Sequence, residues 1–263
     1  MVSGKEPRRA MIAISLQSGS NGNCIYVESH GVGVLLDAGI SGIQAERRLF
    51  AHRREIRKVR AVVISHDHSD HIRCAGVFHR KYKLPIFATE KTRAAARGAL
   101  DGVDALTRFH AGETLRVGPL SIETIPTPHD AVDGVAFVVT DGRARIGVLT
   151  DLGHVFNGLE DVVRSLDGVF IESNYDPEML RNGPYPEFLQ ERIRGPHGHI
   201  SNAESAELVR RCAGPRLKWV CLAHLSEQNN LPDLALRTHR RISQAPYRLA
   251  VASRYEVSGV FEL

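Results

Sequence analysis

The chain has few of the residues that hold small extracellular proteins together. Its 263 residues include four cysteines, and no two of them lie at Cys-x-x-Cys spacing, which argues against a disulfide framework or a cysteine-rich metal site. A chain of this length buries enough surface to fold without such links. We therefore expect reduced, mostly buried thiols, as is usual in a cytoplasmic protein.

Long hydrophobic runs are also absent. No stretch approaches the ~20 apolar residues that cross a membrane. The first apolar stretch, Met11 to Leu16, is too short for the core of a signal peptide, so it is predicted to be a strand. The sequence thus predicts a cytoplasmic protein with no membrane partner. Residues 1–10 are expected to form a flexible tail, and residues 11–263 a single domain.

The chain has only a small excess of charge of either sign. Lys and Arg number 34 against 30 Asp and Glu, a net charge of +4 that permits an anionic partner without requiring one. Basic residues are nonetheless concentrated from Arg47 to Arg60, where Glu55 is the one acid. That stretch is either the solvated face of a helix or a track for a phosphate backbone.

What the sequence does contain is an alternation of short β-branched runs, turn residues and helical stretches. Strands are predicted at 11–16, 24–28, 33–37, 60–65, 86–88, 120–124, 135–140, 146–150, 168–172 and 219–223, with a last one near Tyr247. Helices are predicted at 41–57, 89–100, 201–212 and 232–243. Many strands in each half favour an α/β (α+β) fold, in which two sheets pack face to face and helices cover them.

Histidine is unusually frequent, with 13 residues, and three of them fall within the six residues from His66 to His71. This group directly follows the buried-strand run 61–65. Residues two apart on a loop point the same way, so His66 and His68 can share one metal. If Asp70 and His71 begin a helix after this loop, they point to a neighbouring position and can share a second metal. Imidazole and carboxylate are suitable ligands for zinc, manganese or iron.

Three further ligand-type residues each follow an apolar, strand-like run. They are His129, Asp151 and His224. The recurring pattern of a strand followed by His or Asp is expected to place these side chains on one rim of the sheets, where loops carry function. Together with the histidine-rich loop, they predict a metal site at that rim.

The order of these residues resembles the metal-ligand set of the metallo-β-lactamase superfamily. The resemblance spans nearly the whole chain, and it implies a four-layer αββα sandwich with its site at one edge. The ligands that it implies for one metal are His66, His68 and His129. Those that it implies for the other are Asp70, His71 and His224, with Asp151 bridging the two metals.

Five further stretches resemble the WalJ/YycJ-like bacterial members of that superfamily. They are SGSNGNC at 18–24, TPHDA at 127–131, ESNYD at 172–176, GHISN at 198–202 and AHLS at 223–226. These members are similar to the superfamily's nucleases and are associated with 5′ to 3′ exonuclease action on DNA. The resemblance therefore implies a metal-dependent phosphodiesterase that acts on nucleic acid, with DNA favoured over RNA.

Two divalent ions suit this chemistry. Ions roughly 3.5 to 4 Å apart can hold a bridging hydroxide as the nucleophile and neutralise phosphoryl oxygens. We expect Zn²⁺ or Mn²⁺, because the ligands mix nitrogen and oxygen. Asp151 would bridge the ions. Asp67 is not a ligand in the pattern, and we expect it to orient a ligand imidazole, with a proton relay as the alternative.

The segment before the helix at 201–212 is the candidate phosphate-binding site. Ser201 and Glu204 form a capping box, and His199 lies just before this helix N-terminus, where free N–H groups and the dipole attract an anion. His199 could bind a non-bridging oxygen or protonate the leaving group, or it could simply bond to its own helix start. Ser201 and Asn174 complete the predicted phosphate site.

Aromatic side chains near this segment suggest one more hypothesis, although the chain has few platforms for base stacking. Tyr175, Tyr185 and Phe188 lie in the polar segment 174–196, which could cover the site and stack on a strand end. Two other functions stay open. The same metals could hydrolyse a small ester, thioester or lactam, or the chain could be a metal-stabilised module that binds DNA without turnover.

Overall fold

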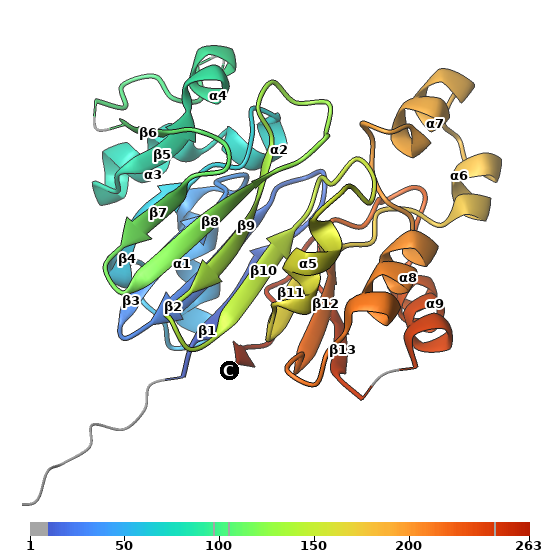
Figure 1. The fold of residues 1–263 in the computed structure, drawn as a ribbon. Coiled ribbons are helices and arrows are strands. Elements are labelled where there is room, and N and C mark those ends of the chain that lie inside the picture. Colours follow the sequence, from blue (N-terminus) through green and yellow to red (C-terminus); the bar gives the residue numbers. More distant parts are fainter. Residues whose placement is uncertain (1–9, 97, 105, 245) are drawn as a thin grey trace, which may run out of the picture.

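Two seven-stranded sheets lie face to face in the computed structural model, which describes residues 10–96, 98–104, 106–244 and 246–263 (Figure 1). The first sheet has the spatial order β14 (Phe261–Glu262), β1 (Ile12–Gln17), β2 (Cys24–Ser29), β3 (Val32–Leu36), β4 (Val59–Val63), β5 (Ile86–Thr89) and β6 (Leu106–Phe109). The second has the order β13 (Arg248–Val251), β12 (Trp219–Ala223), β11 (Gly168–Glu172), β10 (Arg145–Leu149), β9 (Val135–Thr140), β8 (Leu120–Pro126) and β7 (Thr114–Val117).

Each sheet is parallel in one half and antiparallel in the other. Strands β3 to β6 pair in parallel, as do strands β10 to β13. The carboxyl ends of parallel neighbours meet at the same edge of a sheet. The loops that follow β3, β4, β10, β11 and β12 are therefore brought to one edge of the molecule, the upper edge in Figure 1.

Helices form the two outer layers. Those on the first sheet are α1 (Gly42–Ala51), α3 (Ala75–Tyr82) and α4 (Glu90–Ala95), and those on the second are α5 (Leu159–Arg164), α8 (Asn202–Cys212) and α9 (Pro232–Ser243). The short helices α2 (Ser69–Ile72), α6 (Pro177–Asn182) and α7 (Glu187–Arg194) lie at the loop edge. A single 3₁₀ turn at Ile56–Lys58 precedes β4.

Three hydrophobic clusters separate these four layers. Along β1, Ala13 packs between the two sheets, whereas its neighbour Ile14 packs under the helices of the first sheet. Along β10, Val148 and Leu149 divide in the same way between the central cluster and the cluster beneath α5 and α8. Strands that are covered on both faces, such as β11 and β12, read as continuous apolar runs, whereas β7 at the edge of its sheet alternates between exposed and buried residues. The predicted αββα sandwich is confirmed.

Several predicted boundaries differ from the structure. The helix expected over 41–57 ends at Ala51, because His52 caps it and Arg53 adopts a left-handed φ of 57° that an α-helix does not accommodate. The helix expected over 89–100 is shorter, at Glu90–Ala95. The segment 174–196, where no helix was predicted, contains α6 and α7. Five further elements, β6, β7, β14, α3 and α5, were not predicted.

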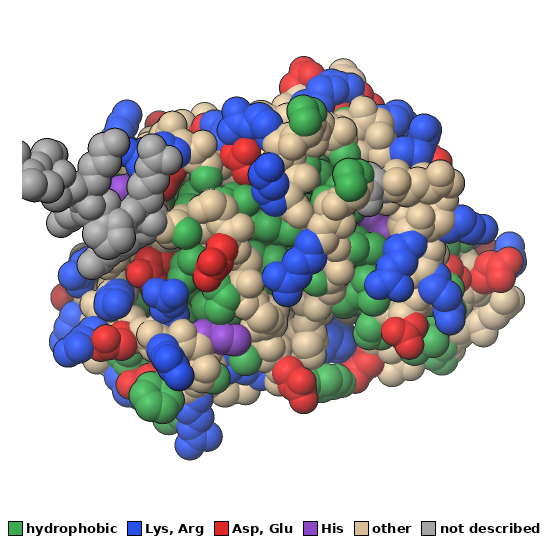
Figure 2. All heavy atoms as spheres, turned by 90° about the horizontal axis from the view of Figure 1, so that it is seen from below, with side chains coloured by type: hydrophobic (Ala, Val, Ile, Leu, Met, Phe, Trp, Pro, Cys, Tyr) green, Lys and Arg blue, Asp and Glu red, His purple; other side chains and the backbone are tan. Residues whose placement is uncertain are grey.

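Other expectations concern the surface and the termini. All four cysteines are unpaired, and Cys24, Cys212 and Cys221 are buried, as predicted. Among the described residues, no helix combines the length and the apolar character needed to cross a membrane. On the face opposite the loop edge, Lys and Arg side chains are dispersed among Asp and Glu (Figure 2). Of the predicted tail, residues 1–9 lie outside the described part, and the domain boundaries stay a prediction.

Candidate metal centre

The histidine-rich loop leaves the end of β4 and turns into α2. The backbone N–H of Ser65 donates to Asp37 Oδ1 at 2.8 Å, which fixes the start of this loop against the end of β3. His68 is the N-cap residue of α2, and Asp70 and His71 lie in that helix, so the condition stated for a second shared metal is met. The loop thus directs its side chains toward the second sheet.

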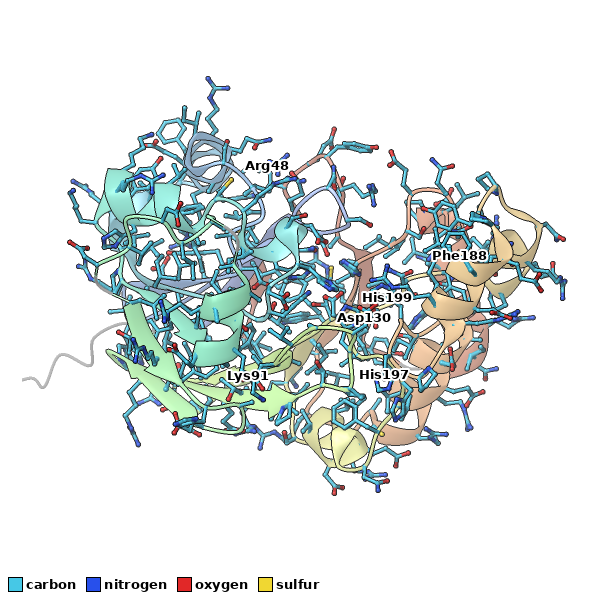
Figure 3. All side chains as sticks on the ribbon, turned by 90° about the horizontal axis from the view of Figure 1, so that it is seen from above. Arg48, Lys91, Asp130, Phe188, His197 and His199 are labelled. Carbon is cyan, nitrogen blue, oxygen red and sulfur yellow. The ribbon has the colours of Figure 1, made fainter. Side chains whose placement is uncertain are left out.

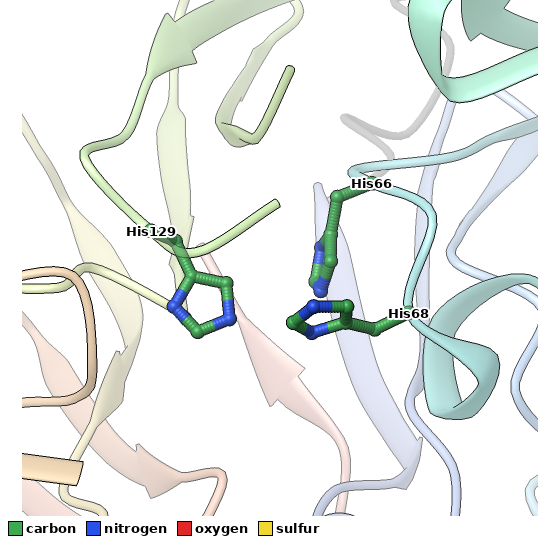
Figure 4. Close-up of side chains that lie close together, drawn as sticks. All are labelled: His66, His68 and His129. Atoms are coloured by element: carbon green, nitrogen blue, oxygen red, sulfur yellow. The ribbon is translucent and has the colours of Figure 1, made fainter. Parts of the chain in front are cut away.

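Three imidazoles converge there. The ligand atoms of His66, His68 and His129 all lie within 4.8 Å of one another (Figure 4). The ring centroids are 4.7 Å apart for His66 and His68, and 5.0 Å apart for His68 and His129. His66 and His129 are buried, whereas His68 is half-buried. These residues, which we call the three-histidine group, come from one loop of each sheet.

A second group lies beside the first. Asp70 Oδ2 is 3.5 Å from His71 Nε2 and 3.5 Å from His224 Nε2. The three ligand atoms again lie within 4.8 Å of one another. We call Asp70, His71 and His224 the Asp-His-His group.

Asp151 stands between the two groups. Its Oδ2 lies 3.4 Å from His71 Nε2, and its Oδ1 lies 3.7 Å from His129 Nε2. Asp151 has a φ of 57° and His224 a φ of 55°, both in the left-handed region that non-glycine residues seldom adopt. Backbone strain of this kind collects at functional sites, where it aims a side chain that a relaxed strand end would turn elsewhere.

The donor atoms fit a divalent cation. Buried polar atoms are normally hydrogen-bonded, and those that are not need an explanation. Four buried atoms of the cluster have no hydrogen-bond partner among the described residues: His66 Nε2, His129 Nε2, His224 Nε2 and Asp151 Oδ2. Imidazole nitrogen and carboxylate oxygen, turned toward one another, are the donor set of a divalent metal site.

Partners behind the imidazoles fix their orientation. His71 Nδ1–H donates to Asp37 Oδ2 at 2.7 Å, and His129 Nδ1–H donates to the carbonyl of Gly198 at 2.9 Å. Such contacts select the tautomer that leaves Nε2 for a metal. Asp37 was not among the predicted site residues. It directly follows the apolar strand Val32–Leu36, and a position after an apolar strand was the signal that identified His129, Asp151 and His224.

Two asparagines complete this outer layer. Asn23, from the stretch 18–24, places Nδ2 3.2 Å from Asp70 Oδ2 and 2.9 Å from His71 Nε2. Asn174 Nδ2 donates to the carbonyl of His224 at 2.8 Å and lies 3.2 Å from its Nδ1. Asn174 is buried, so its amide holds His224 in place and is not open to a phosphate.

Opposed charges dominate the cluster. Burial and the neighbouring His71 lower the pKa of His66 well below its ordinary value. Burial would also lower the pKa of His71, but Asp151 and Asp37 raise it well above that value. Burial would raise the pKa of Asp151, and His224 and His71 lower it. The carboxylates therefore stay ionised and attract cations, either protons on imidazoles or a divalent ion that replaces those protons.

His199 lies next to the cluster and is held by an acid. Its Nδ1–H donates to Glu172 Oε1 at 2.6 Å, and its ring centroid is 5.0 Å from that of His129. Glu172 is fully buried, and burial would raise its pKa, but the adjacent His199 lowers it to about 2. The ionised carboxylate leaves His199 Nε2 for the hollow that His199 lines. The sequence interpretation did not assign Glu172, which ends β11.

The polar groups near Ser201, predicted to bind a phosphate, are hydrogen-bonded to other groups of the protein. The capping box is present, and the hydroxyl and backbone N–H of Ser201 both bond to the Glu204 carboxylate. The N–H groups of Ile200 and Asn202 donate to Glu172 and to the carbonyl of Tyr175. These groups are paired within the protein, so Ser201 orders the helix start behind His199. Of the predicted phosphate-binding residues, His199 is the one that lines the hollow.

Asp67 links the histidine-rich loop to a second loop by a hydrogen bond. Its Oδ1 accepts the backbone N–H of Val132 at 3.1 Å, which ties the histidine-rich loop to the loop that carries His129. This contact differs from the expected bond to a ligand imidazole, and a catalytic role for Asp67 stays a prediction.

Two of the aromatic residues proposed to stack on a base differ in exposure. Tyr175 is 6% exposed, so the hypothesis that it stacks on a base is wrong, whereas Phe188 is 73% exposed.

Part of the basic stretch 47–60 serves the fold. Arg48 donates to the carbonyl of Leu16 at 2.9 Å and also bonds to the Gln17 side chain. Arg54 lies 3.5 Å from Glu28. Arg48 is drawn apart from His199 in the view onto the loop edge (Figure 3). A role of this stretch toward nucleic acid stays a prediction.

A hollow of about 290 Å³ opens over the cluster. On one side it is lined by His199 and by five of the seven candidate ligands, namely His68, Asp70, His129, Asp151 and His224. On the other side it is lined by α7 and the residues before it, through Tyr185, Leu189, Arg192 and Ile193. The hollow therefore has a polar floor and a largely apolar wall with one guanidinium.

Comparison with known proteins agrees with this arrangement. A family model described as a beta-lactamase superfamily domain matches residues 33–222. The chain therefore belongs to the metallo-β-lactamase superfamily. Within it, the chain belongs to the WalJ/YycJ-like group. It is 38% identical to the exodeoxyribonuclease WalJ of Streptococcus pneumoniae over 85% of this chain and 84% of that protein. It is 34% identical to the exodeoxyribonuclease YycJ of Bacillus anthracis over 84% of each.

The fold also matches a solved structure. The metallo-β-lactamase fold protein YhfI of Bacillus subtilis superposes with a TM-score of 0.74 over 97% of this chain and 100% of that one. The two sequences are 17% identical, so this likeness concerns the fold alone.

Proposed function

We propose that this protein is a metal-dependent exodeoxyribonuclease that hydrolyses phosphodiesters at DNA ends. The observation that carries the proposal is the convergence of the three-histidine group, the Asp-His-His group and Asp151 on one hollow, with four buried donor atoms lacking a partner among the described residues. The exodeoxyribonucleases that are 38% and 34% identical over most of the chain support the reaction class.

Two divalent ions would fit the two groups. His66, His68 and His129 would hold the first, Asp70, His71 and His224 the second, and Asp151 would bind both. When bound, such ions supply Lewis acidity and neutralise charge on phosphoryl oxygens. The nitrogen-rich ligands suit Zn²⁺, and the carboxylates also suit Mn²⁺.

The chain's own residues then position the substrate and move a proton. His199 presents Nε2 to the hollow, where it donates a proton to the leaving oxygen or a hydrogen bond to a non-bridging oxygen. Glu172 keeps Nδ1 protonated and the ring oriented, at 2.6 Å. We expect 5′ to 3′ polarity, as the sequence resemblance implies.

Release of nucleotides from end-labelled DNA tests the proposal. Chelator-stripped protein is given Zn²⁺ or Mn²⁺ and incubated with single-stranded and duplex DNA and with RNA, each labelled at the 5′ or the 3′ end. We expect mononucleotides from DNA, released first from the 5′ label, and no turnover without metal. Asp151→Asn should abolish cleavage, and a variant as fast as wild type would contradict the proposed mechanism.

The same assay separates the alternatives. Tight DNA binding with no turnover in the presence of any metal would indicate that the protein is a DNA-binding module and not an enzyme. Turnover of thioester or lactam substrates in place of DNA would indicate a small-molecule hydrolase on the same residues.

A further inference from the structure

Arg192 is the one Lys or Arg side chain among the described residues that line the hollow. It extends from α7 toward Asp130, and its Nε and Nη2 each lie 2.6 Å from Asp130 Oδ2. The side chain is 62% exposed. An ion pair this exposed contributes little to stability. No residue of α7 is fully buried, so the fold does not depend on this contact.

Asp130 shows what kind of group fits between Arg192 and the cluster. While Oδ2 contacts Arg192, Oδ1 lies 3.3 Å from His129 Nε2 and 3.6 Å from His68 Nε2. An anionic group therefore already spans the distance from the guanidinium to the three-histidine group. The phosphate of a DNA strand carries the same charge and has oxygens that can contact both sides.

We propose that Arg192 exchanges Asp130 for the phosphate of the bound DNA strand, and that the wall beside it receives the attached nucleoside. The proposal deepens the exonuclease function above and rests on it. The wall consists of Tyr185, Leu189 and Ile193, which are half-buried and line the hollow next to Arg192. A planar guanidinium donates two parallel hydrogen bonds to a phosphate, which a lysine does not reproduce.

The helix offers a matched control. Arg194 lies on the same short helix, two residues or about 200° around it from Arg192, so it faces away from the hollow. Its side chain is 52% exposed and lies 3.8 Å from Glu191. Arg192→Ala and Arg194→Ala thus remove the same charge from opposite faces of one helix.

Steady-state kinetics on a single-stranded oligonucleotide gives the first measurement. Arg192→Ala should lower kcat/KM about 10- to 100-fold, mainly through KM, because a charge-assisted hydrogen bond is lost. Arg192→Lys should fall between this variant and wild type. One phosphate contact fewer should also make the slope of log kcat/KM against log salt shallower by about 0.7. Arg194→Ala should match wild type in both quantities.

Inhibition by small anions separates the phosphate from the nucleoside. Arg192→Ala should raise the inhibition constants of thymidine 5′-monophosphate and inorganic phosphate alike. Tyr185→Ala should raise that of the nucleotide and leave that of phosphate unchanged. If Tyr185→Ala affects both anions equally, the nucleoside wall is wrong.

Binding without turnover keeps this inference separable from the exonuclease function. In an Asp151→Asn background, the fluorescence anisotropy of a labelled oligonucleotide should show binding at least about 10-fold weaker with Arg192→Ala than with Arg194→Ala. Equal binding by the two variants would overturn the role of Arg192. If wild type releases no nucleotide but this difference persists, the exonuclease function fails and the phosphate contact stands.

Discussion

Glu172 Oε1 lies 2.6 Å from His199 Nδ1, and this contact joins the inner face of the second sheet to the hollow. Glu172 ends β11, and its Oε2 also accepts the backbone N–H groups of Leu152 and Ile200 at 3.0 and 3.3 Å. One buried carboxylate therefore ties two loops, the one after β10 and the one before α8, to the end of β11. It also determines that His199 presents Nε2, and not Nδ1, to a substrate.

Replacing this carboxylate should impair turnover more than binding. Glu172→Gln keeps the shape but removes the carboxylate that accepts Nδ1–H of His199 and orients its ring, so we expect kcat to fall about 10²-fold with little change in KM. The measurement is steady-state cleavage of an oligonucleotide, from which kcat and KM are obtained separately. Glu178→Gln, whose side chain is 83% exposed, is the control.

A double variant shows whether Glu172 acts through His199. If it does, Glu172→Gln should cost almost nothing further in a His199→Ala background. Additive losses in the double variant would mean that the two residues contribute independently.

Asp37 should govern metal affinity without touching the metal. It accepts Nδ1–H of His71 at 2.7 Å, and loss of such a partner typically weakens metal binding 10- to 100-fold. Asp37→Asn should show this weakening in a competition titration against a chelating dye. Asp161→Asn, at a side chain that is 83% exposed on α5, should titrate like wild type. Equal affinities for both variants would contradict the role of Asp37.

The candidate ligands could be predicted because they obey a local rule. Each follows an apolar run, and parallel strands carry such positions to one edge, as seen for Asp151 after β10 and His224 after β12. Asp37 and Glu172 obey the same rule and were missed. Only the order of strands within each sheet, set by contacts between distant parts of the chain, shows which strand ends meet the cluster.

The segment around α7 was missed for another reason. Helices are recognised in a sequence by an apolar stripe that faces a core, and no residue of α7 is fully buried. Its apolar residues Leu189 and Ile193 face the hollow instead. The part of the chain that contacts substrate in our proposal therefore has no face that packs into the hydrophobic core.

Gly39 should be irreplaceable at the back of the cluster. A Cβ at this position would lie 1.7 Å from the carbonyl oxygen of Asp70 and 2.5 Å from the backbone nitrogen of Asn23. Gly39→Ala must push these loops apart, at a cost of about 2 kcal/mol or more, which lowers Tm by at least about 4 °C. Bound metal, measured by elemental analysis, should fall with it.

Gly214 supplies the comparison for that variant. A Cβ at Gly214 meets nothing within 4 Å, so Gly214→Ala should leave both Tm and metal content unchanged. If Gly39→Ala behaved like Gly214→Ala, the close approach of the two loops would have no part in forming the metal centre.

His239 should make the protein sensitive to acid independently of the metal centre. It is fully buried on α9, its Nδ1 has no hydrogen-bond partner among the described residues, and burial lowers its pKa from 6.5 to about 3. The folded state therefore binds this proton less readily than the unfolded state does. The stability that the neutral ring contributes is fully present above pH 6.5, and it is lost as the pH falls toward 3, by up to about 1.4 kcal/mol per pH unit.

His239→Gln removes the titration of this ring. The free energy of unfolding of this variant in urea, measured on metal-free protein from pH 6 to pH 4, should therefore fall less steeply than that of wild type. The exposed His110 provides a control, because His110→Gln should follow the wild-type slope. If the free energy of unfolding fell equally steeply with pH in wild type and in His239→Gln, the buried ring would not be the cause of the sensitivity to acid.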